Sequence, residues 1–267
     1  MPCGDDLGHA KQPNRGNSRV LLFRAVAHGA LYDIADDLLP TRGQFMTPSL
    51  VDLDGDDDLD LVLGGFGQPW QVFRNEVEAL GGHTFLRLTG RTSNADALGA
   101  RVAVDVAGVT QRWVYGDVAS PQAIEHGPID VALGAAPAID ALTVRWPSGY
   151  TQTLRGAPRA RRIELVEPSL VAVEPASRHA PADGVATVTV TVRPADPAGA
   201  PRRADVRITA PYHPEAAWVG AEETLADGAV RRSLRAPRSA GSVVVAVTID
   251  GTALSVRPRV WFDAVTP

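Results

Sequence analysis

The chain has 267 residues, of which 45% are hydrophobic and 21% charged, a composition typical of a folded globular protein with room for one large domain or two to three small ones. Its net charge of −5 argues against a protein that binds nucleic acid by neutralising phosphates. No run of about 18 apolar residues occurs, so no membrane span is expected, and the single cysteine, Cys3, can form no internal disulfide.

Short runs in which β-branched or aromatic residues alternate with polar ones recur along the chain. In chain order these runs cover residues 20–23, 59–65, 71–75, 85–90, 101–108, 141–146, 161–167, 186–194 and 242–251. A period of two residues predicts strands with one buried face, and glycine, proline or aspartate separates the runs as turns would. At most one helical turn is expected, near 76–82. The pattern therefore predicts an all-β protein built of sandwiches or barrels.

Two joints divide these runs into three predicted domains. The first joint follows Asn75, where an acidic segment gives way to a new series of strands. The second is the sequence Glu-Pro-Ser-Leu at 167–170, where a strand ends and a proline begins a fresh segment. We therefore expect domains at 1–80, 81–167 and 168–267.

An aspartate-rich loop at residues 52–60 is the most informative segment for function. So many carboxylates repel one another unless a cation joins them. Oxygen ligands on a flexible loop suit Ca²⁺, which accepts six to eight of them, better than Mg²⁺, which requires a stricter octahedron. Counting loop positions 1, 3, 5, 7 and 9, the predicted calcium ligands are Asp52, Asp54, Asp56, Asp58 through its backbone carbonyl, and Asp60.

Two alternatives compete with this calcium site. An EF-hand shares the same spacing but requires Gly at position 6 and Glu at position 12, where this chain has Asp57 and Leu63. The flanking runs also predict strands rather than helices, so an EF-hand is excluded. The second alternative is a solvated acidic turn that holds no metal. No His or Cys lies near the loop, which favours a structural ion over a catalytic one.

The sequence from Arg19 to Asn75 resembles an FG-GAP/VCBS repeat, the calcium-binding blade unit of integrin-like β-propellers. The resemblance lies in LLFRAVAHGALYDIADDL and SLVDLDGDDDLDLVLGGFGQPWQVFRN, although Asp57 replaces the family's usual glycine. It implies a partial β-propeller blade. Propellers need about four to eight blades, and only one aspartate loop occurs here. We therefore expect either that the chain is a C-terminal piece of a longer multidomain protein whose upstream region carries the signal peptide, or that it has kept only a remnant of its propeller.

The segment 84–167 resembles the ASPIC/UnbV domain, which commonly follows VCBS repeats, as in cartilage acidic protein-like chains. The similarity lies in TFLRLTGRTSNADALGARVAVDVAG, VALGAAPAIDALTVRWPSGYTQTL and RIELVEP, and its most specific piece is VRWPSG at 144–149. Residues 119–134 depart from the family pattern. The resemblance implies a β-sandwich or barrel without established chemistry. Trp146 and Trp70 could each stack on a sugar, but packing within the protein is the commoner use of such aromatics.

The segment 169–265 resembles an invasin-type bacterial immunoglobulin-like domain. The similarity lies in PADGVATVTVTVRPADPAGAPRRADVRIT and GSVVVAVTIDG. About seven short strands in 100 residues are what a two-sheet Ig-like sandwich needs. The resemblance implies a spacer or an adhesin stalk.

No catalytic constellation is recognised in the sequence. The histidines lack metal-binding spacing, and no nucleophile elbow, phosphate loop or dinucleotide motif occurs. The arginines at 155, 159, 161 and 162 are interpreted as a solvated turn rather than a binding patch. We therefore expect a non-catalytic, secreted or cell-surface module for adhesion or for binding a protein or glycan. The alternative is an accessory or carbohydrate-binding tail of a larger secreted enzyme.

Overall fold

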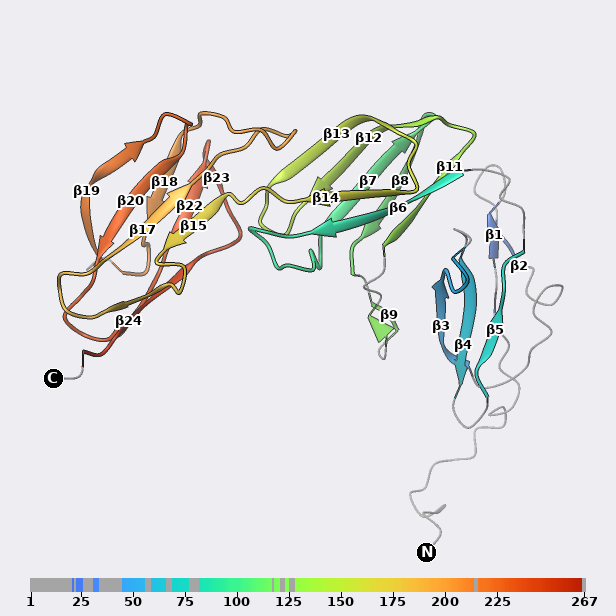
Figure 1. Ribbon diagram of the computed structural model, residues 1–267, viewed down its shortest axis with the longest axis horizontal. Helices are drawn as coiled ribbons and strands as arrows, with labels where there is room; N and C mark the ends of the chain where they lie inside the picture. Colours follow the sequence, from blue (N-terminus) through green and yellow to red (C-terminus); the bar gives the residue numbers. More distant parts are fainter. Residues whose placement is uncertain are drawn as a thin grey trace, which may run out of the picture. The chain divides into compact units, whose positions relative to one another are not determined.

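The computed structural model describes residues 21, 23–25, 31–33, 45–55, 59–65, 69–76, 82–116, 118–120, 123–124, 128–213 and 216–265. Every regular element in these ranges is a β-strand, which confirms the prediction of an all-β protein (Figure 1). The same ranges hold no helix long and apolar enough to cross a membrane. The helical turn expected near 76–82 falls mainly outside them. The chain forms two compact units, Met1–Leu80 with Ser120–Ala123, and Gly81–Ala119 with Ile124–Pro267.

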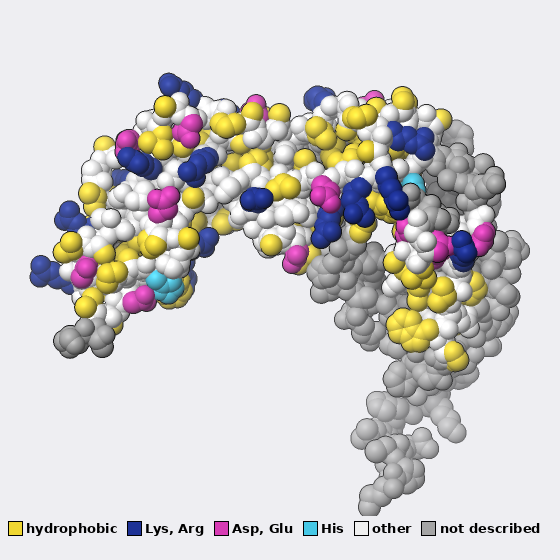
Figure 2. Space-filling model, viewed as in Figure 1, with side chains coloured by type: hydrophobic (Ala, Val, Ile, Leu, Met, Phe, Trp, Pro, Cys, Tyr) yellow, Lys and Arg dark blue, Asp and Glu magenta, His cyan; other side chains and the backbone are white. Residues whose placement is uncertain are grey.

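The first unit contains two small antiparallel sheets. One pairs β1 (Phe23–Ala25) with β2 (Leu31–Asp33), and the other has the order β3 (Phe45–Val51), β4 (Asp60–Gly65), β5 (Gln71–Phe73). In β4, Leu61 pairs with Leu50 on one side and with Phe73 on the other. Figure 2 shows hydrophobic side chains gathered over this sheet. The β3–β4 hairpin places the aspartate-rich loop in the connection between its two strands.

The second unit begins with a β-sandwich, called here the middle sandwich. Its two sheets have the orders β11-β6-β14 and β13-β12-β7-β8. The strands are β6 (Gly82–Thr89), β7 (Arg101–Val106), β8 (Val109–Val114), β11 (Ile129–Gly134), β12 (Ala138–Arg145), β13 (Thr151–Pro158) and β14 (Arg162–Val166). β9 (Val118–Ser120) and β10 (Ala123–Ile124), of which Ser120 and Ala123 belong to the first unit, pair separately as a two-stranded sheet. Alternate residues of these strands enter one core, which contains Leu86, Leu88, Val102, Val104, Val131, Leu142 and Trp146.

The remainder of the second unit is an Ig-like β-sandwich, called here the C-terminal sandwich. Its sheets have the orders β15-β17-β20-β19, β16-β24-β21 and β18-β22-β23. The strands are β15 (Val171–Glu174), β16 (His179–Pro181), β17 (Thr187–Val192), β18 (Val206–Thr209), β19 (Ala217–Thr224), β20 (Val230–Arg235), β21 (Gly241–Val244), β22 (Ala246–Ile249), β23 (Thr252–Ala253) and β24 (Arg259–Asp263). All three sheets contribute to a second core, which includes Val188, Val190, Ile208, Leu234, Val247, Val260 and Phe262.

The apolar run at 242–251 forms two strands where the sequence pattern predicted one. β21 pairs with β24, whereas β22 pairs with β18 in a different sheet. Val245 lies between them, fully buried, and its amide donates a 2.8 Å hydrogen bond to the Pro258 carbonyl. The chain thus changes sheet without leaving the core, so the run stays apolar across the break.

Candidate functional site

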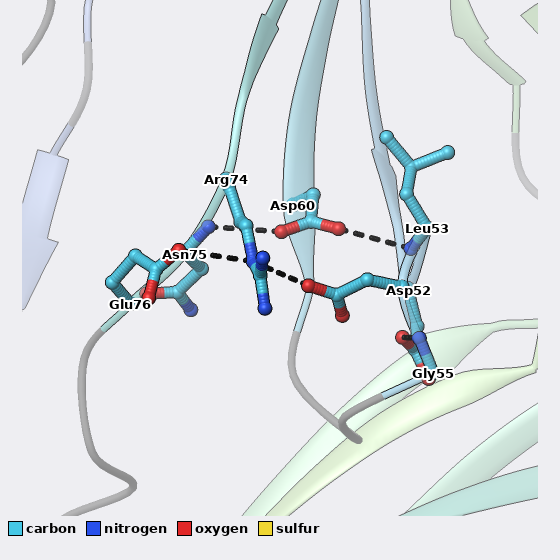
Figure 3. Close-up of polar contacts among 8 residues, drawn as sticks. Asp52, Leu53, Gly55, Asp60, Arg74, Asn75 and Glu76 are labelled. Atoms are coloured by element: carbon cyan, nitrogen blue, oxygen red, sulfur yellow. Dashed lines mark hydrogen bonds and ion pairs between the residues drawn. The ribbon is translucent and has the colours of Figure 1, made fainter.

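The loop after β3 folds back on itself through a local turn. The Gly55 amide donates a 2.7 Å hydrogen bond to Asp52 Oδ1 (Figure 3). Gly55 has a φ of 81°, a left-handed conformation that glycine adopts without steric cost. Asp52 therefore helps to shape the loop in addition to lining it.

Asp60, the first residue of β4, fixes the ends of the neighbouring segments. Its side chain is only 2% exposed. Oδ1 accepts a hydrogen bond from the Asn75 amide and Oδ2 accepts one from the Leu53 amide, both at 2.9 Å (Figure 3). These backbone hydrogen bonds, Asn75 first and Leu53 second, lower the pKa of Asp60 below its usual value, because they favour the charged form. Asp60 is therefore a negative charge held at the base of the loop.

Arg74, directly after β5, supplies positive charge beside this carboxylate. Its guanidinium forms an ion pair with Asp54 and a second one, of 3.0 Å, with Glu76. It also contributes to the lowered pKa of Asp60 through its charge. The acidic loop is thus partly neutralised from within the chain, which sequence reasoning did not anticipate.

The structure describes three of the five predicted calcium ligands, Asp52, Asp54 and Asp60. Asp56 and Asp58 lie outside the described residues. Within the described ranges, no group of three or more His, Cys, Asp or Glu residues is arranged to hold a metal ion. The described donors are nevertheless carboxylate oxygens, the ligand type that calcium prefers, and each Asp60 oxygen keeps a second lone pair beyond its hydrogen bond. The donor chemistry therefore fits calcium, and the site remains a prediction.

The lowered pKa of Asp60 predicts acid sensitivity of the first unit. Because the folded-state pKa lies below the unfolded value of about 3.9, Asp60 contributes stability above that pH, and this stability is lost as the pH falls through the folded-state pKa. Asp60→Asn should lower the melting temperature of the first unit at pH 7 and lower it by a smaller amount at pH 3, below the unfolded-state value. Calorimetry across this pH range measures it, with Asp105→Asn in the second unit as control. A deficit equal at both pH values would contradict the prediction.

A second polar site lies at the junction of the two sandwiches, around Glu167. This side chain is 1% exposed. Its Oε2 accepts hydrogen bonds from the amides of Arg91 (3.0 Å), Thr92 (2.9 Å) and Ser93 (2.6 Å). Its Oε1 accepts hydrogen bonds from the hydroxyls of Ser93 (3.0 Å) and Ser148 (2.5 Å). Five donors thus surround one buried carboxylate, which the sequence analysis did not single out.

The turn 147–149 extends this network to the C-terminal sandwich. The Ser148 carbonyl accepts a 2.8 Å hydrogen bond from the Ser255 amide. Gly149 has a φ of 94°, a left-handed conformation that glycine adopts without steric cost, so glycine suits this turn. Ser148 therefore links the Glu167 network to the C-terminal sandwich, and Gly149 permits the turn that places it there.

Tyr150 packs against both hydrophobic cores. Its hydroxyl donates a hydrogen bond to the Asp196 carbonyl in the C-terminal sandwich. Burial, followed by the charge of Asp196, raises the pKa of Tyr150 to about 12, so this hydroxyl stays protonated and continues to donate at ordinary pH. The two sandwiches are thus joined by apolar packing as well as by the polar network.

The two tryptophans considered for sugar stacking lie in opposite environments. Trp146 is 1% exposed, and its Nε1 donates a 3.1 Å hydrogen bond to Gln152 Oε1. Its ring is therefore a core side chain and presents no face to a ligand. Trp70 in the first unit is 73% exposed.

Comparison with known proteins assigns the middle of the chain and leaves its function open. The solved structures that resemble the chain include invasin, a bacterial integrin-binding protein (15% identity, TM-score 0.29, covering 82% of this chain and 39% of that one). Another is the D00-D0 domain of intimin (15% identity, TM-score 0.30, covering 72% of this chain and 90% of that one). A third is a glycosyl hydrolase family 2 member from Bacteroides cellulosilyticus (13% identity, TM-score 0.25, covering 61% of this chain and 21% of that one). At these TM-scores the likenesses carry no functional argument.

Curated proteins provide no match to the chain. The sequence profile of the ASPIC and UnbV family, in contrast, matches residues 90–171. This match confirms the resemblance noted for the middle segment, while the FG-GAP/VCBS resemblance of the first segment stays a prediction. Residues 90–171, about a third of the chain, are thus similar to the ASPIC and UnbV family.

Proposed function

We propose that this chain is a non-catalytic module for adhesion or ligand binding outside the cytoplasm, and that calcium stabilises its first unit. The observation that supports the calcium site best is the arrangement of Asp60. This buried carboxylate stays charged and lies at the base of a loop with aspartates at every second position. Calcium would be bound by Asp52, Asp54, Asp56, Asp60 and the Asp58 carbonyl, and its contribution would be structural.

The structure suggests a competing explanation, in which Arg74 alone compensates the acidic loop. Its ion pairs with Asp54 and Glu76 place one positive charge where a bound cation would otherwise act. Both explanations predict that the loop needs positive charge, but only the first predicts that calcium supplies it. An accessory tail of a larger secreted enzyme remains the alternative role for the whole chain, and either role is compatible with a calcium-stabilised first unit.

The calcium test is calorimetry of the full chain with added calcium and with EDTA. Calcium should raise the stability of the first unit by about 2.7 kcal/mol at a hundredfold excess over its dissociation constant, and leave the second unit unchanged. Asp52→Asn is the sharpest variant, because its amide oxygen still accepts the Gly55 hydrogen bond while the charge is lost. It should reduce the calcium shift strongly, whereas Asp105→Asn should not.

Two further variants separate the explanations. Asp57→Gly should bind calcium as well as the parent or better, since glycine accepts positive φ and one repulsive charge is removed. Arg74→Gln should keep the calcium shift or enlarge it if calcium binds, because a competing cation is removed. Identical melting with calcium and EDTA in the parent chain, together with calcium-independent damage from Arg74→Gln, would show that Arg74 rather than calcium compensates the loop, and would refute the calcium proposal.

A further inference from the structure

One face of the β13-β12-β7-β8 sheet carries an arginine on every strand. Residues paired across antiparallel strands point to the same side of the sheet. The registers place Arg145 opposite Arg101, Ala103 opposite Arg112, and Ala141 opposite Arg155. The face opposite the core therefore presents Arg101, Arg112, Arg145 and Arg155, all exposed, and these four residues are called here the arginine face.

The arginine face contains little negative charge. Of the residues on it, Asp105 is the one acid, and its Oδ1 accepts a 2.5 Å hydrogen bond from the Thr110 hydroxyl. Among the residues that the structure describes, no carboxylate lies within ion-pair distance of any of the four arginines, whereas Arg202, Arg207 and Arg231 in the C-terminal sandwich each pair with one. The four guanidinium groups are thus available to an external anion.

The pairing of Arg101 with Arg145 carries an energetic cost. Like charges directly opposite each other on neighbouring strands destabilise a sheet. The other sheet of the middle sandwich shows the ordinary complementary arrangement, with Arg87 opposite Glu164 across β6 and β14. Figure 2 shows basic and acidic side chains together over β6 and β14. The whole chain has a net charge of −5, so the positive charge of the arginine face does not follow from the overall composition.

Apart from the exposed Val114, which is paired with Arg101 at the edge of the sheet, the remaining uncharged residues of the arginine face are small or hydroxylated. Ala103, Ala141, Thr143, Thr151 and Thr153 lie between the arginines in the same registers. These alanines and threonines form a floor without an aromatic side chain on which a nucleic-acid base could stack, the contact that single-strand binders rely on. The floor also lacks a group of large apolar side chains that could enter a lipid bilayer. Hydroxyls and planar guanidinium groups instead suit a hydroxylated, anionic partner.

We propose that the arginine face binds an acidic polysaccharide, a glycan chain that bears carboxylate or sulfate groups. Strands lie about 4.8 Å apart and alternate residues along a strand about 7 Å apart, so the four guanidinium groups can contact several anionic groups of one extended chain. Each guanidinium can donate two parallel hydrogen bonds to a carboxylate or sulfate. This inference rests on the proposed non-catalytic binding role and names its ligand class, but it does not depend on calcium.

The test measures binding of the full chain to immobilised heparin, polygalacturonate and neutral dextran. Both acidic glycans should bind at low salt, with affinity that falls as salt rises, and dextran should not bind. Preference for heparin assigns sulfate as the recognised group, and preference for polygalacturonate assigns carboxylate. Added EDTA should leave binding unchanged, which separates this proposal from the calcium site.

The central variant is Arg101→Ala with Arg145→Ala, which should weaken binding by about a hundredfold, or tenfold for each guanidinium group that is removed. The matched control, Arg207→Ala with Arg231→Ala, removes the same charge from exposed arginines of the C-terminal sandwich and should retain parental affinity. Arg112→Ala with Arg155→Ala is a second, independent pair on the outer strands. The proposal is overturned by equal losses in the control, by no glycan binding at low salt, or by tighter binding of single-stranded DNA.

The melting temperature of the middle sandwich should change in the direction opposite to glycan affinity. Arg101→Thr removes the like-charge pair, so it should raise the melting temperature of the middle sandwich at low salt while it weakens glycan binding. The stability gain should shrink at 1 M salt, where screening reduces the repulsion. A variant that loses both stability and binding would show that Arg101 supports the sheet, and would contradict its assignment as a ligand-binding residue.

Discussion

Glu167→Ala should remove about 3–5 kcal/mol of stability from the second unit, because it leaves several buried hydrogen-bond donors without their acceptor. The truncation deprives three backbone amides and two hydroxyls of their acceptor. Each buried donor without a partner costs about 1–3 kcal/mol. Water that enters the vacated space can accept hydrogen bonds from some of these donors. The expected loss of stability is therefore smaller than the summed cost of five donors without a partner.

Chemical denaturation of the full chain measures this effect, with two matched variants. Glu164→Ala changes an exposed glutamate of β14, three residues earlier, and should stay within about 0.5 kcal/mol of the parent. Glu167→Gln keeps the side-chain length and one oxygen acceptor, but turns an NH₂ group toward amide donors, so its cost should be intermediate. A Glu167→Ala loss no larger than that of Glu164→Ala would mean that the junction network contributes nothing to stability.

The network around Glu167 could not be read from the sequence, because its partners are distant along the chain. The amide donors lie 74 to 76 residues before Glu167, and Ser148 lies 19 residues before it. No periodic pattern links such positions. The sequence did contain the pieces, since the Arg-Thr-Ser stretch, the Trp-Pro-Ser-Gly turn and the final Glu-Pro all belong to the ASPIC/UnbV resemblance. Only the fold shows that they meet.

Strand faces were predictable where alternation was strict. The run that became β7 exposes Arg101 and buries Val102, as its period of two residues indicates. The prediction of a single strand was wrong for 242–251, because the uninterrupted apolar stretch 243–247 conceals the point at which the chain changes sheet. The arginine face was also hidden, since its four residues are spread over 101–155. The turn predicted for the arginines at 155–162 is in fact the end of β13, a short link and the start of β14.

The aspartate loop was visible in the sequence because its spacing is local. The hydrogen bonds and ion pairs that hold the loop in place were not visible in the sequence. Asp60 accepts a hydrogen bond from the Asn75 amide, 15 residues later, and Arg74 pairs with Asp54 only because β5 lies next to β4. The pairing register of β4 and β5 therefore decides which charged side chain lies beside the aspartates of the loop. The spacing alone could suggest a cation but could not reveal that the chain supplies one of its own.

Trp146→Ala should cost the middle sandwich about 3–5 kcal/mol, the range for truncating a buried aromatic side chain. The ring is almost wholly buried among the core residues, so its removal leaves a cavity and also deprives Gln152 Oε1 of its donor. Trp146→Phe retains most of the apolar contact but loses the Nε1 donor, and should cost about 1–3 kcal/mol. Urea titrations of both variants give these values from the shift in midpoint.

The same two variants distinguish packing from ligand binding at Trp146. Because the ring is enclosed by the core, Trp146→Phe should bind heparin and polygalacturonate as the parent does, provided it is assayed well below its melting temperature. Trp261→Phe serves as the exposed control, since that ring lies on the surface of the C-terminal sandwich, stacked beside His179, and should change stability little. A Trp146→Phe variant with parental stability but weakened glycan binding would place a ligand at the ring and contradict its role as a core residue.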